Sequence, residues 1–310
     1  MEYTKPPLTY QEQAELLITR GLIADKTILI QRLQSVNYYR LSGYLYPFRM
    51  KDQSGCQLDQ YLPDTTLEKV WRRYTFDRQL RLLVLDGIER IEVALKTKIT
   101  QNFSLKYGPF GYLYKNNLPR MSDDKHKNLI KSIRQETDRS KKEDFVEHFK
   151  NKYGDQHHDL PLWMAVEIMS FGTFLSFYNG IASHERKAAA QEFDLVLPLL
   201  DSWILTLNVI RNICAHHGRL WNRELGVKPK IPRQDKYPNW HIPVATPPDR
   251  LFSVLTIIKY LLHYIAPQSA WPKRLANLLS EYTDIPLNFM GFPENWRTHA
   301  LWLDITIPVP

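Results

Sequence analysis

The chain has 310 residues, of which 44% are hydrophobic and 24% are charged, and this composition excludes a disordered protein. Its 41 basic and 33 acidic residues give a net charge of +8, which favours a polyanionic partner such as RNA without requiring one. Cys56 and Cys214 lie far apart and form no C-x-x-C pair, so neither a disulfide framework nor a structural zinc site is expected.

No stretch of the sequence has the character of a membrane element. The most apolar runs are interrupted by Asp201 or by Lys259 and His263, and the first residues form no apolar core. Neither a signal peptide nor a membrane span is therefore expected. The cytoplasm is the predicted compartment.

The first part of the sequence predicts two short helices followed by an aromatic segment. Thr9 and Glu12 form a capping box that begins a helix through about Arg20, and a second helix is expected from Lys26. Residues 37–49 contain five aromatic side chains and two arginines. Unpaired bases stack on aromatic rings and guanidinium groups, so this segment is a candidate RNA contact, although core packing explains tyrosines at helical spacing equally simply.

A single long helix is predicted from Thr66 to about Lys106, because its apolar residues keep the helical period and no proline interrupts it. Charges of both signs then alternate over residues 122–152, which predicts an exposed helical pair rather than a specific RNA groove. Another helix is expected from Trp163 to about Tyr178.

The last part of the chain predicts a long loop and two more helices. Six prolines and no periodicity in residues 224–248 predict a long loop. It follows directly on the catalytic candidate, so it is a candidate to gate a substrate or clamp RNA. An apolar helix is expected over residues 251–265, and a shorter one from Trp271. Helical periods dominate the whole chain and no strand alternation or Asn-Gly hairpin appears, so the predicted fold class is all-α.

The strongest chemical signal lies between Arg211 and Arg223, where arginines, histidines, an aromatic ring and amides follow an apolar run. That run, Leu195–Ile213, has the spacing of a buried amphipathic helix. Arg211 and His216 flank its polar stripe, and a helix end at Gly218 can bring both side chains to one cleft. The stripe itself consists of Asp201, Asn208, Asn212 and, if the helix continues, Arg219.

Arg211 and His216 together suit the cleavage of RNA without a metal ion. An imidazole, with an unperturbed pKa of about 6.5, can take a proton from a ribose 2′-hydroxyl or give one to the leaving 5′-oxygen. A guanidinium can stabilise the negative charge that builds on the phosphate between them. The spacing by itself is not specific, because Arg120 and His126 also satisfy it in an expected loop. Capping or ion pairing within a buried helix is the alternative role of both residues.

No metal site and no cofactor are predicted. His157 and His158 stand beside Asp159, but adjacent residues point in different directions and no third ligand has suitable spacing. Cys214 precedes His216 closely, yet it falls on the apolar face of its helix and is expected to be a buried residue rather than a nucleophile.

Strings around these residues resemble known families. Arg211-Asn-x-x-x-His216 resembles the R-x(4–6)-H signature of HEPN domains, and the longer string at 211–222 resembles the abortive-infection (Abi) family of the AbiD/AbiF type. The resemblance spans nearly the whole chain. Its other strings are Lys5-Pro-Pro-Leu-Thr-Tyr10, Asn37-Tyr-Tyr-Arg-Leu-Ser-Gly-Tyr44, Phe76-Asp-Arg-x-Leu-Arg81, Ile88-Glu-Arg-Ile-Glu92, Leu160-Pro-Leu-Trp163, Ser170-Phe-Gly172 and Met290-Gly-Phe-Pro293.

The resemblance implies a HEPN-like helical bundle with additional N- and C-terminal helices. We divide it into an N-terminal helical region (1–63), a HEPN-like core that carries the motif (64–266) and a C-terminal helical extension (267–310). It implies a phage-defence or toxin-type, metal-independent endoribonuclease that, in AbiF-like members, associates with a structured non-coding RNA. Since one motif supplies half of a two-base cleavage, a homodimer with facing motifs is expected. The runner-up hypothesis is a non-catalytic RNA-binding protein that holds a folded non-coding RNA, and a third is a protein-interaction scaffold without RNA.

The candidate residues come from the motif and from the matching strings. Arg78 and Glu92 are candidates to face His216 across the cleft, where a carboxylate can orient an imidazole. Some HEPN toxins have, two residues after the motif histidine, a tyrosine that a partner nucleotidyltransferase modifies; here Gly218 occupies that position, so control by a bound RNA fits better. The catalytic candidates are Arg211, Asn212, His216 and His217, and the RNA-binding candidates are Arg40, Tyr44, Arg78, Arg219, Trp221 and Arg223.

Overall fold

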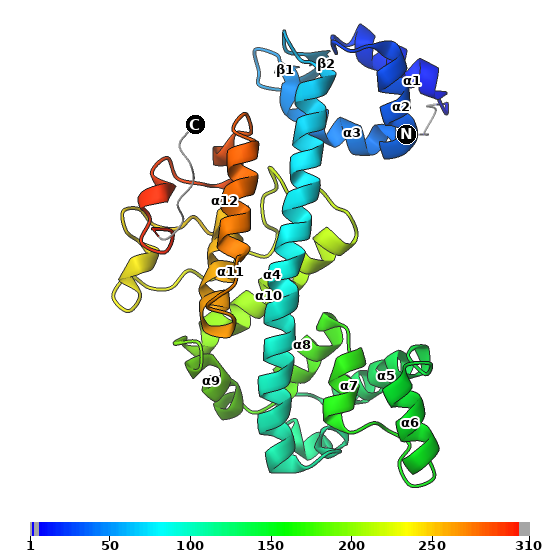
Figure 1. The fold of residues 1–310 in the computed structure, drawn as a ribbon, viewed down its shortest axis with the longest axis vertical. Helices are drawn as coiled ribbons and strands as arrows, with labels where there is room; N and C mark the ends of the chain where they lie inside the picture. Colours follow the sequence, from blue (N-terminus) through cyan, green and yellow to red (C-terminus); the bar gives the residue numbers. More distant parts are fainter. Residues whose placement is uncertain (1, 3–5, 304–310) are drawn as a thin grey trace.

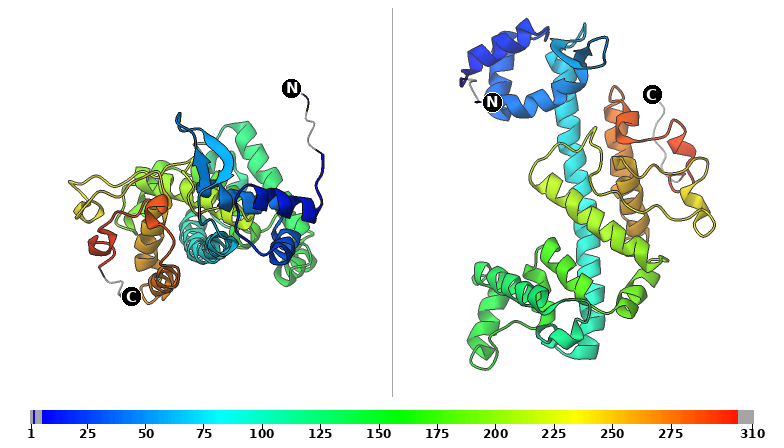
Figure 2. Two further views of the ribbon diagram at one scale, coloured as in Figure 1. Left: turned by 90° about the horizontal axis from the view of Figure 1, so that it is seen from above. Right: turned by 180° about the vertical axis from the view of Figure 1, so that it is seen from behind.

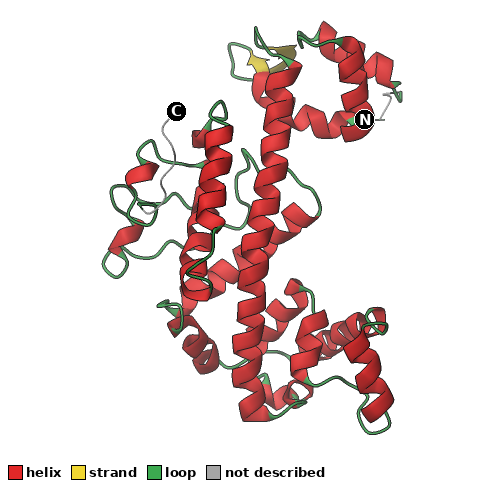
Figure 3. Cartoon of the chain, viewed as in Figure 1, coloured by secondary structure: helices red, strands yellow, loops and turns green. Residues whose placement is uncertain are grey.

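Helices dominate the computed structural model, which describes residue 2 and residues 6–303 (Figure 3). Lys5, the first residue of one of the matching strings, lies outside the described residues. The all-α prediction is confirmed, apart from one small antiparallel sheet. The helices are α1 (Tyr10–Thr19), α2 (Lys26–Val36), α3 (Tyr38–Leu45), α4 (Leu67–Tyr107), α5 (Asp123–Arg139), α6 (Asp144–Tyr153), α7 (Leu162–Ile168), α8 (Phe171–Gly180), α9 (Ser183–Gln191), α10 (Leu197–Ala215), α11 (Leu251–Ile265) and α12 (Trp271–Glu281), and the strands are β1 (Arg49–Lys51) and β2 (Gln57–Tyr61).

The long helix α4 is the axis around which the other elements are arranged (Figure 1). Thr66 caps its amino terminus by accepting a hydrogen bond from the Lys69 N–H at 3.2 Å, and Gly108, with a φ of 77°, ends it. Its 41 residues, at about 1.5 Å each, give a rod about 60 Å long. The helices α1–α3 lie at its amino-terminal end and α5–α8 at its carboxyl-terminal end, α11 and α12 follow one side, and α10 crosses it (Figures 1 and 2).

Several predicted helices are confirmed. The helix α1 begins at the capping box of Thr9 and Glu12, and the helical pair expected in residues 122–152 is α5 and α6. The helix α11 has the predicted bounds. In these segments the capping signals and the apolar period agree with each other, which is the condition under which local sequence determines an element.

The single helix predicted from Trp163 to about Tyr178 is wrong, because the chain forms two helices there, α7 and α8. The break follows Met169, whose carbonyl accepts a hydrogen bond from the buried Lys96 ammonium at 2.6 Å. The Ser170 hydroxyl then accepts a hydrogen bond from an N–H in the first turn of α8, at 3.2 Å, and so begins a new helix.

A short hairpin of β1 and β2 is the second departure from prediction, since no strand was expected. A turn at residues 52–55 joins the two strands. The Asp52 carboxylate organises it by accepting hydrogen bonds from the N–H groups of Ser54 and Cys56, both at 2.9 Å. The N–H of Tyr61 in β2 donates to the Arg20 carbonyl at 2.8 Å, which fastens the hairpin to the end of α1.

The helix α4 meets α11 and α12 at Gly87, where no side chain separates the helices. A Cβ atom at this position lies 2.6 Å from Ile258 Cγ2 and 2.9 Å from Trp271 Nε1. The indole N–H of Trp271 donates to the Leu83 carbonyl at 2.8 Å, which fixes the ring against α4. The close approach of the three helices therefore depends on glycine at this position.

Gly87→Ala is expected to destabilise the protein by about 1–3 kcal/mol, because the added methyl group overpacks this contact. Gly43→Ala is the matched control, since a Cβ atom at Gly43 in α3 meets no atom within 4 Å. It is expected to leave stability unchanged or to raise it by up to about 1 kcal/mol. Urea unfolding measures both changes, and equal stability of the two variants would contradict the packing argument.

His299 is a buried histidine in the C-terminal part of the core, 0% exposed. Its Nε2 lies 3.2 Å from Thr246 Oγ1, and its Nδ1 accepts a hydrogen bond from the Leu301 N–H at 3.3 Å. Burial lowers the pKa of the ring below its ordinary value of 6.5. The ring is therefore held neutral in the folded protein.

The protein is expected to lose stability as the pH falls below about 6.5, because His299 binds a proton in the unfolded chain before it does so in the folded one. His299→Gln should flatten the dependence of the free energy of unfolding on pH between about pH 7 and pH 5. His263→Ala, which removes an exposed histidine from α11, should retain the pH dependence of the wild type. Urea unfolding at a series of pH values distinguishes these outcomes; identical slopes for wild type and His299→Gln would exclude this origin of the pH dependence.

Candidate functional site

The end of α10 sets the direction of the motif side chains. The helix ends at Ala215, and His216 is its C-cap residue. His217 follows with a φ of 58°, in the left-handed region. The N–H groups of His216, His217 and Gly218 donate to carbonyls of the last turn at 2.8–3.0 Å, the pattern of a Schellman termination. The predicted helix end at Gly218 is thus corrected, because the left-handed residue is His217.

Arg211 and Asn212 lie in the last turn of α10 and reach the solvent. The Arg211 Nη1 donates to the Asn212 Oδ1 at 3.3 Å. The side chains of His216 and His217 are exposed and form no hydrogen bond or ion pair with another described residue. One turn earlier, Asn208 buries its Oδ1 without a partner. The end of α10 therefore presents a guanidinium and two imidazoles that are not neutralised by a described carboxylate.

Asp201, the first residue of the predicted polar stripe, does not belong to this cluster. It lies ten residues before Arg211, about 15 Å away along the helix axis. Its carboxylate accepts a hydrogen bond from the Tyr178 hydroxyl at 2.7 Å and pairs with Arg186 at 3.1 Å. Asp201 therefore joins α10 to α8 and α9.

Two arginines clamp α3 to the segment that follows α10. Arg40, on α3, donates to the His217 carbonyl, and Arg219 donates in the other direction to the Gly43 carbonyl. Arg223 donates from Nε to the Arg219 carbonyl at 2.7 Å. Three of the predicted RNA-binding arginines are therefore brought next to the catalytic candidates, two of them through contacts with an element far away in the sequence.

A buried carboxylate, that of Asp77 in α4, lies beside this clamp and is 0% exposed. One of its oxygens accepts hydrogen bonds from the Tyr44 hydroxyl at 2.5 Å and from Arg81. The other accepts the N–H groups of Leu220 and Trp221, at 3.1 and 2.6 Å. Burial raises the pKa of the carboxyl, whereas these donors act in the opposite direction. The Asp77 carboxylate thus joins the helices α3 and α4 to the segment after α10.

Asp77 and Arg81 were not predicted from the sequence. Both lie in a matching string from which only Arg78 was a candidate. Their positions carry a signal, because Asp77 stands three residues after Tyr74 and seven before Val84, on the apolar stripe of α4. An acid and a base four residues apart on a buried face predict a buried ion pair.

Two of the RNA-binding candidates are buried, and two other candidates form no hydrogen bond or ion pair with the motif residues in the described part of the chain. Tyr44 and Trp221 are 1% and 0% exposed, so their rings belong to the core and are not available for stacking on a base. The Glu92 carboxylate pairs with the Lys96 ammonium at 2.9 Å rather than with an imidazole. Arg78 is exposed on α4 and forms no hydrogen bond or ion pair with another described residue, so its contact with RNA stays a prediction.

The structure also bears on nucleophiles, metals and membranes. Cys214 is buried as expected, and burial raises the pKa of its thiol to about 12, which disfavours the nucleophilic thiolate. Within residues 6–303 no group of three His, Cys, Asp or Glu side chains is arranged to hold a metal ion. No helix in the described part of the chain is long and apolar enough to cross a membrane.

The sequence matches the family described as Abi-like protein over residues 31–222, more than half of the chain. The chain belongs to this family. The match runs from α2 to the segment after α10, and it includes Asp77, Arg211 and His216. No curated protein and no solved structure gives a match. Membership of the Abi-like family indicates a part in abortive infection, a form of phage defence.

Asp77→Asn is expected to destabilise this Abi-like protein by about 3–5 kcal/mol, because it leaves Arg81 buried without a counter-charge. Asp86→Asn makes the same change further along α4. It removes the partly exposed pairs with Arg90 and Arg274, and is expected to cost about 1 kcal/mol or less. Urea unfolding gives both values. A loss for Asp77→Asn no larger than that for Asp86→Asn would refute the importance assigned to the buried carboxylate.

Proposed function

We propose that this Abi-like protein is a metal-independent endoribonuclease of the HEPN type. His216 is the general acid or base that exchanges a proton with the ribose 2′-hydroxyl or the leaving 5′-oxygen. Arg211 stabilises the charge on the phosphate, and Asn212 orients Arg211. The observation that carries the proposal is that Arg211 and His216 both reach the solvent at the end of α10, and neither forms an ion pair with a described residue.

The surroundings of the motif support an anionic substrate. Arg40, Arg219 and Arg223 lie beside it, and each donates to a main-chain carbonyl. A guanidinium carries several N–H donors, so one such bond fixes the group and leaves others for phosphate oxygens. Arginines fixed in this way bind phosphates with little loss of side-chain entropy. The Arg40 contact also holds the carbonyl of His217, which restrains the backbone next to His216.

A second copy of the chain completes the site in this proposal. Cleavage through a cyclic phosphate needs one group to accept a proton and another to donate one, and each chain contributes one motif. Two chains related by a twofold axis, with their motifs facing, supply both, and His217 supports binding of the substrate. A structured non-coding RNA bound to the same arginines controls access to the pair of motifs.

Purified without nuclease treatment, the wild-type protein is expected to cleave single-stranded RNA with EDTA present and to leave 2′,3′-cyclic phosphate ends. His216→Ala and Arg211→Ala should each lower the rate by at least about 100-fold with little loss of RNA affinity. His263→Ala removes another exposed histidine, on α11, and should keep full activity. Gel analysis of the products, with filter binding of the same RNA, gives both quantities.

Other outcomes would identify a different function. A discrete co-purifying RNA without cleavage under any condition, and without a difference in toxicity between wild type and variants, would establish the non-catalytic RNA-binding protein instead. If the protein shows no RNA binding that depends steeply on salt, the remaining hypothesis is the protein-interaction scaffold. Sedimentation of the active form as a monomer would refute the paired motifs.

A further inference from the structure

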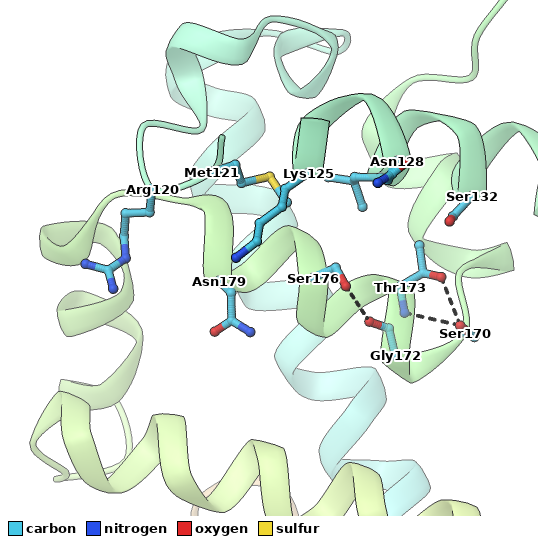
Figure 4. Close-up of a pocket in the computed structure, with 11 residues that line it drawn as sticks. Arg120, Met121, Lys125, Asn128, Ser132, Ser170, Gly172, Thr173, Ser176 and Asn179 are labelled. Carbon is cyan, nitrogen blue, oxygen red and sulfur yellow. Dashed lines mark hydrogen bonds between the residues drawn. The ribbon is translucent and has the colours of Figure 1, made fainter. Parts of the chain in front are cut away.

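A polar groove of about 560 Å³ lies between α5 and α8 (Figure 4). Figures 1 and 2 place both helices on the same side of α4 as the carboxyl-terminal end of α10, which carries the motif. Among the described residues that line the groove are two cations, Arg120 and Lys125, and no carboxylate. Its other polar lining residues are Asn128, Ser132, Ser170, Thr173, Ser176 and Asn179.

Several lining side chains have hydrogen-bonding groups that the protein does not use. Figure 4 shows Lys125 of α5 directed across the groove toward Asn179 of α8. Arg120, at the same end, donates one N–H to a serine hydroxyl at 2.8 Å and keeps its others. The lining residues whose side chains form no hydrogen bond or ion pair with described residues are Lys125, Asn128, Ser132 and Asn179.

The wall of the groove that α8 forms is held firmly from the protein side. Ser170 begins the helix by accepting a hydrogen bond from the Thr173 N–H. Behind this turn, Lys96 of α4 donates to the Met169 carbonyl at 2.6 Å and pairs with Glu92 at 2.9 Å. Glu92 and Ser170 both belong to matching strings that have no part in the proposed cleavage. They hold the groove instead.

We infer that this groove binds the ribose–phosphate backbone of a single-stranded RNA. The inference rests on the proposed function, because the strand in the groove is the one that passes over the motif. Lys125 and Arg120 suit phosphate oxygens. The amide and hydroxyl side chains suit ribose hydroxyls, including the 2′-hydroxyl that distinguishes RNA from DNA.

Two other classes of ligand fit the lining less well. An apolar ligand would bury the amides and hydroxyls without partners, which costs free energy. A hard metal ion takes carboxylate and carbonyl oxygens and would be repelled by the two cations. The ten residues of α8 are about 15 Å long, which is room for about four stacked nucleotides.

Fluorescence anisotropy with a single-stranded oligoribonucleotide of about ten nucleotides tests the groove. Every variant also carries His216→Ala, so that the probe is not cleaved. Lys125→Ala is expected to weaken binding several-fold and to lower the magnitude of the salt slope by about 0.7, the value for one phosphate contact on a single strand. Lys127→Ala removes the same charge from α5 outside the groove lining, and should change neither quantity.

The ribose contacts are tested with a DNA probe of the same sequence. The His216→Ala protein, the parent of these variants, is expected to bind RNA more tightly than DNA. The double variant Asn128→Ala with Asn179→Ala should lower the ratio of the two affinities, whereas Asn151→Ala, an exposed asparagine of α6, should leave it unchanged. An unchanged ratio in the double variant would overturn the ribose contacts.

The outcomes separate this inference from the proposed function. Equal effects of Lys125→Ala and Lys127→Ala on RNA binding would overturn the inference that the groove binds RNA. The proposed nuclease activity would still stand if the wild type cleaves RNA and His216→Ala does not. Selective weakening by Lys125→Ala in a protein that never cleaves RNA supports the groove and refutes the nuclease. Both variants are on the exposed surface of α5, so thermal unfolding should be unchanged by either.

Discussion

The carboxylate of Asp77 is the interaction on which the arrangement of the site depends. A charge that is 0% exposed persists in a protein only when donors surround it. Here the donors come from Tyr44 on α3, from Arg81 on α4 and from the main chain of residues 220–221. If one of these segments moved away, the carboxylate would lose a donor where no water can replace it. The N-terminal helices and the motif are therefore kept in register by a buried charge as well as by apolar packing.

Elements whose signals are local could be predicted from the sequence. Capping residues and the helical period define α1, α4 and α11 without reference to other parts of the chain. The break between α7 and α8 could not be predicted, since the Lys96 ammonium that holds the Met169 carbonyl comes from another helix. The hairpin was missed for a different reason. Its strands are short and mostly exposed, so their sequence has no buried face to produce an alternating pattern.

The candidate site also has some features that local sequence predicts and others that depend on contacts between distant segments. Arg211 and His216 belong to one segment, so their common position at the end of a helix follows from spacing and periodicity. The contact of Arg40 with the His217 carbonyl joins residues 177 positions apart, and no local pattern encodes it. The aromatic segment 37–49 shows the consequence. The same pattern of tyrosines fits stacking on bases or packing in a core, and for Tyr44 only the folded structure distinguishes the two. The groove between α5 and α8 likewise exists only after two distant segments meet.

The left-handed backbone at His217 gives the two adjacent histidines different constraints. At a φ of 58° a β-branched side chain is strained, whereas glycine or asparagine adopts this conformation readily. The residue at 217 is thus restricted by backbone geometry, while the backbone places no such restriction on His216. His217→Val would strain the backbone at the end of α10, directly beside His216, without a contact with either motif side chain. The backbone that carries a motif histidine is in this way constrained by the conformation of the residue next to it.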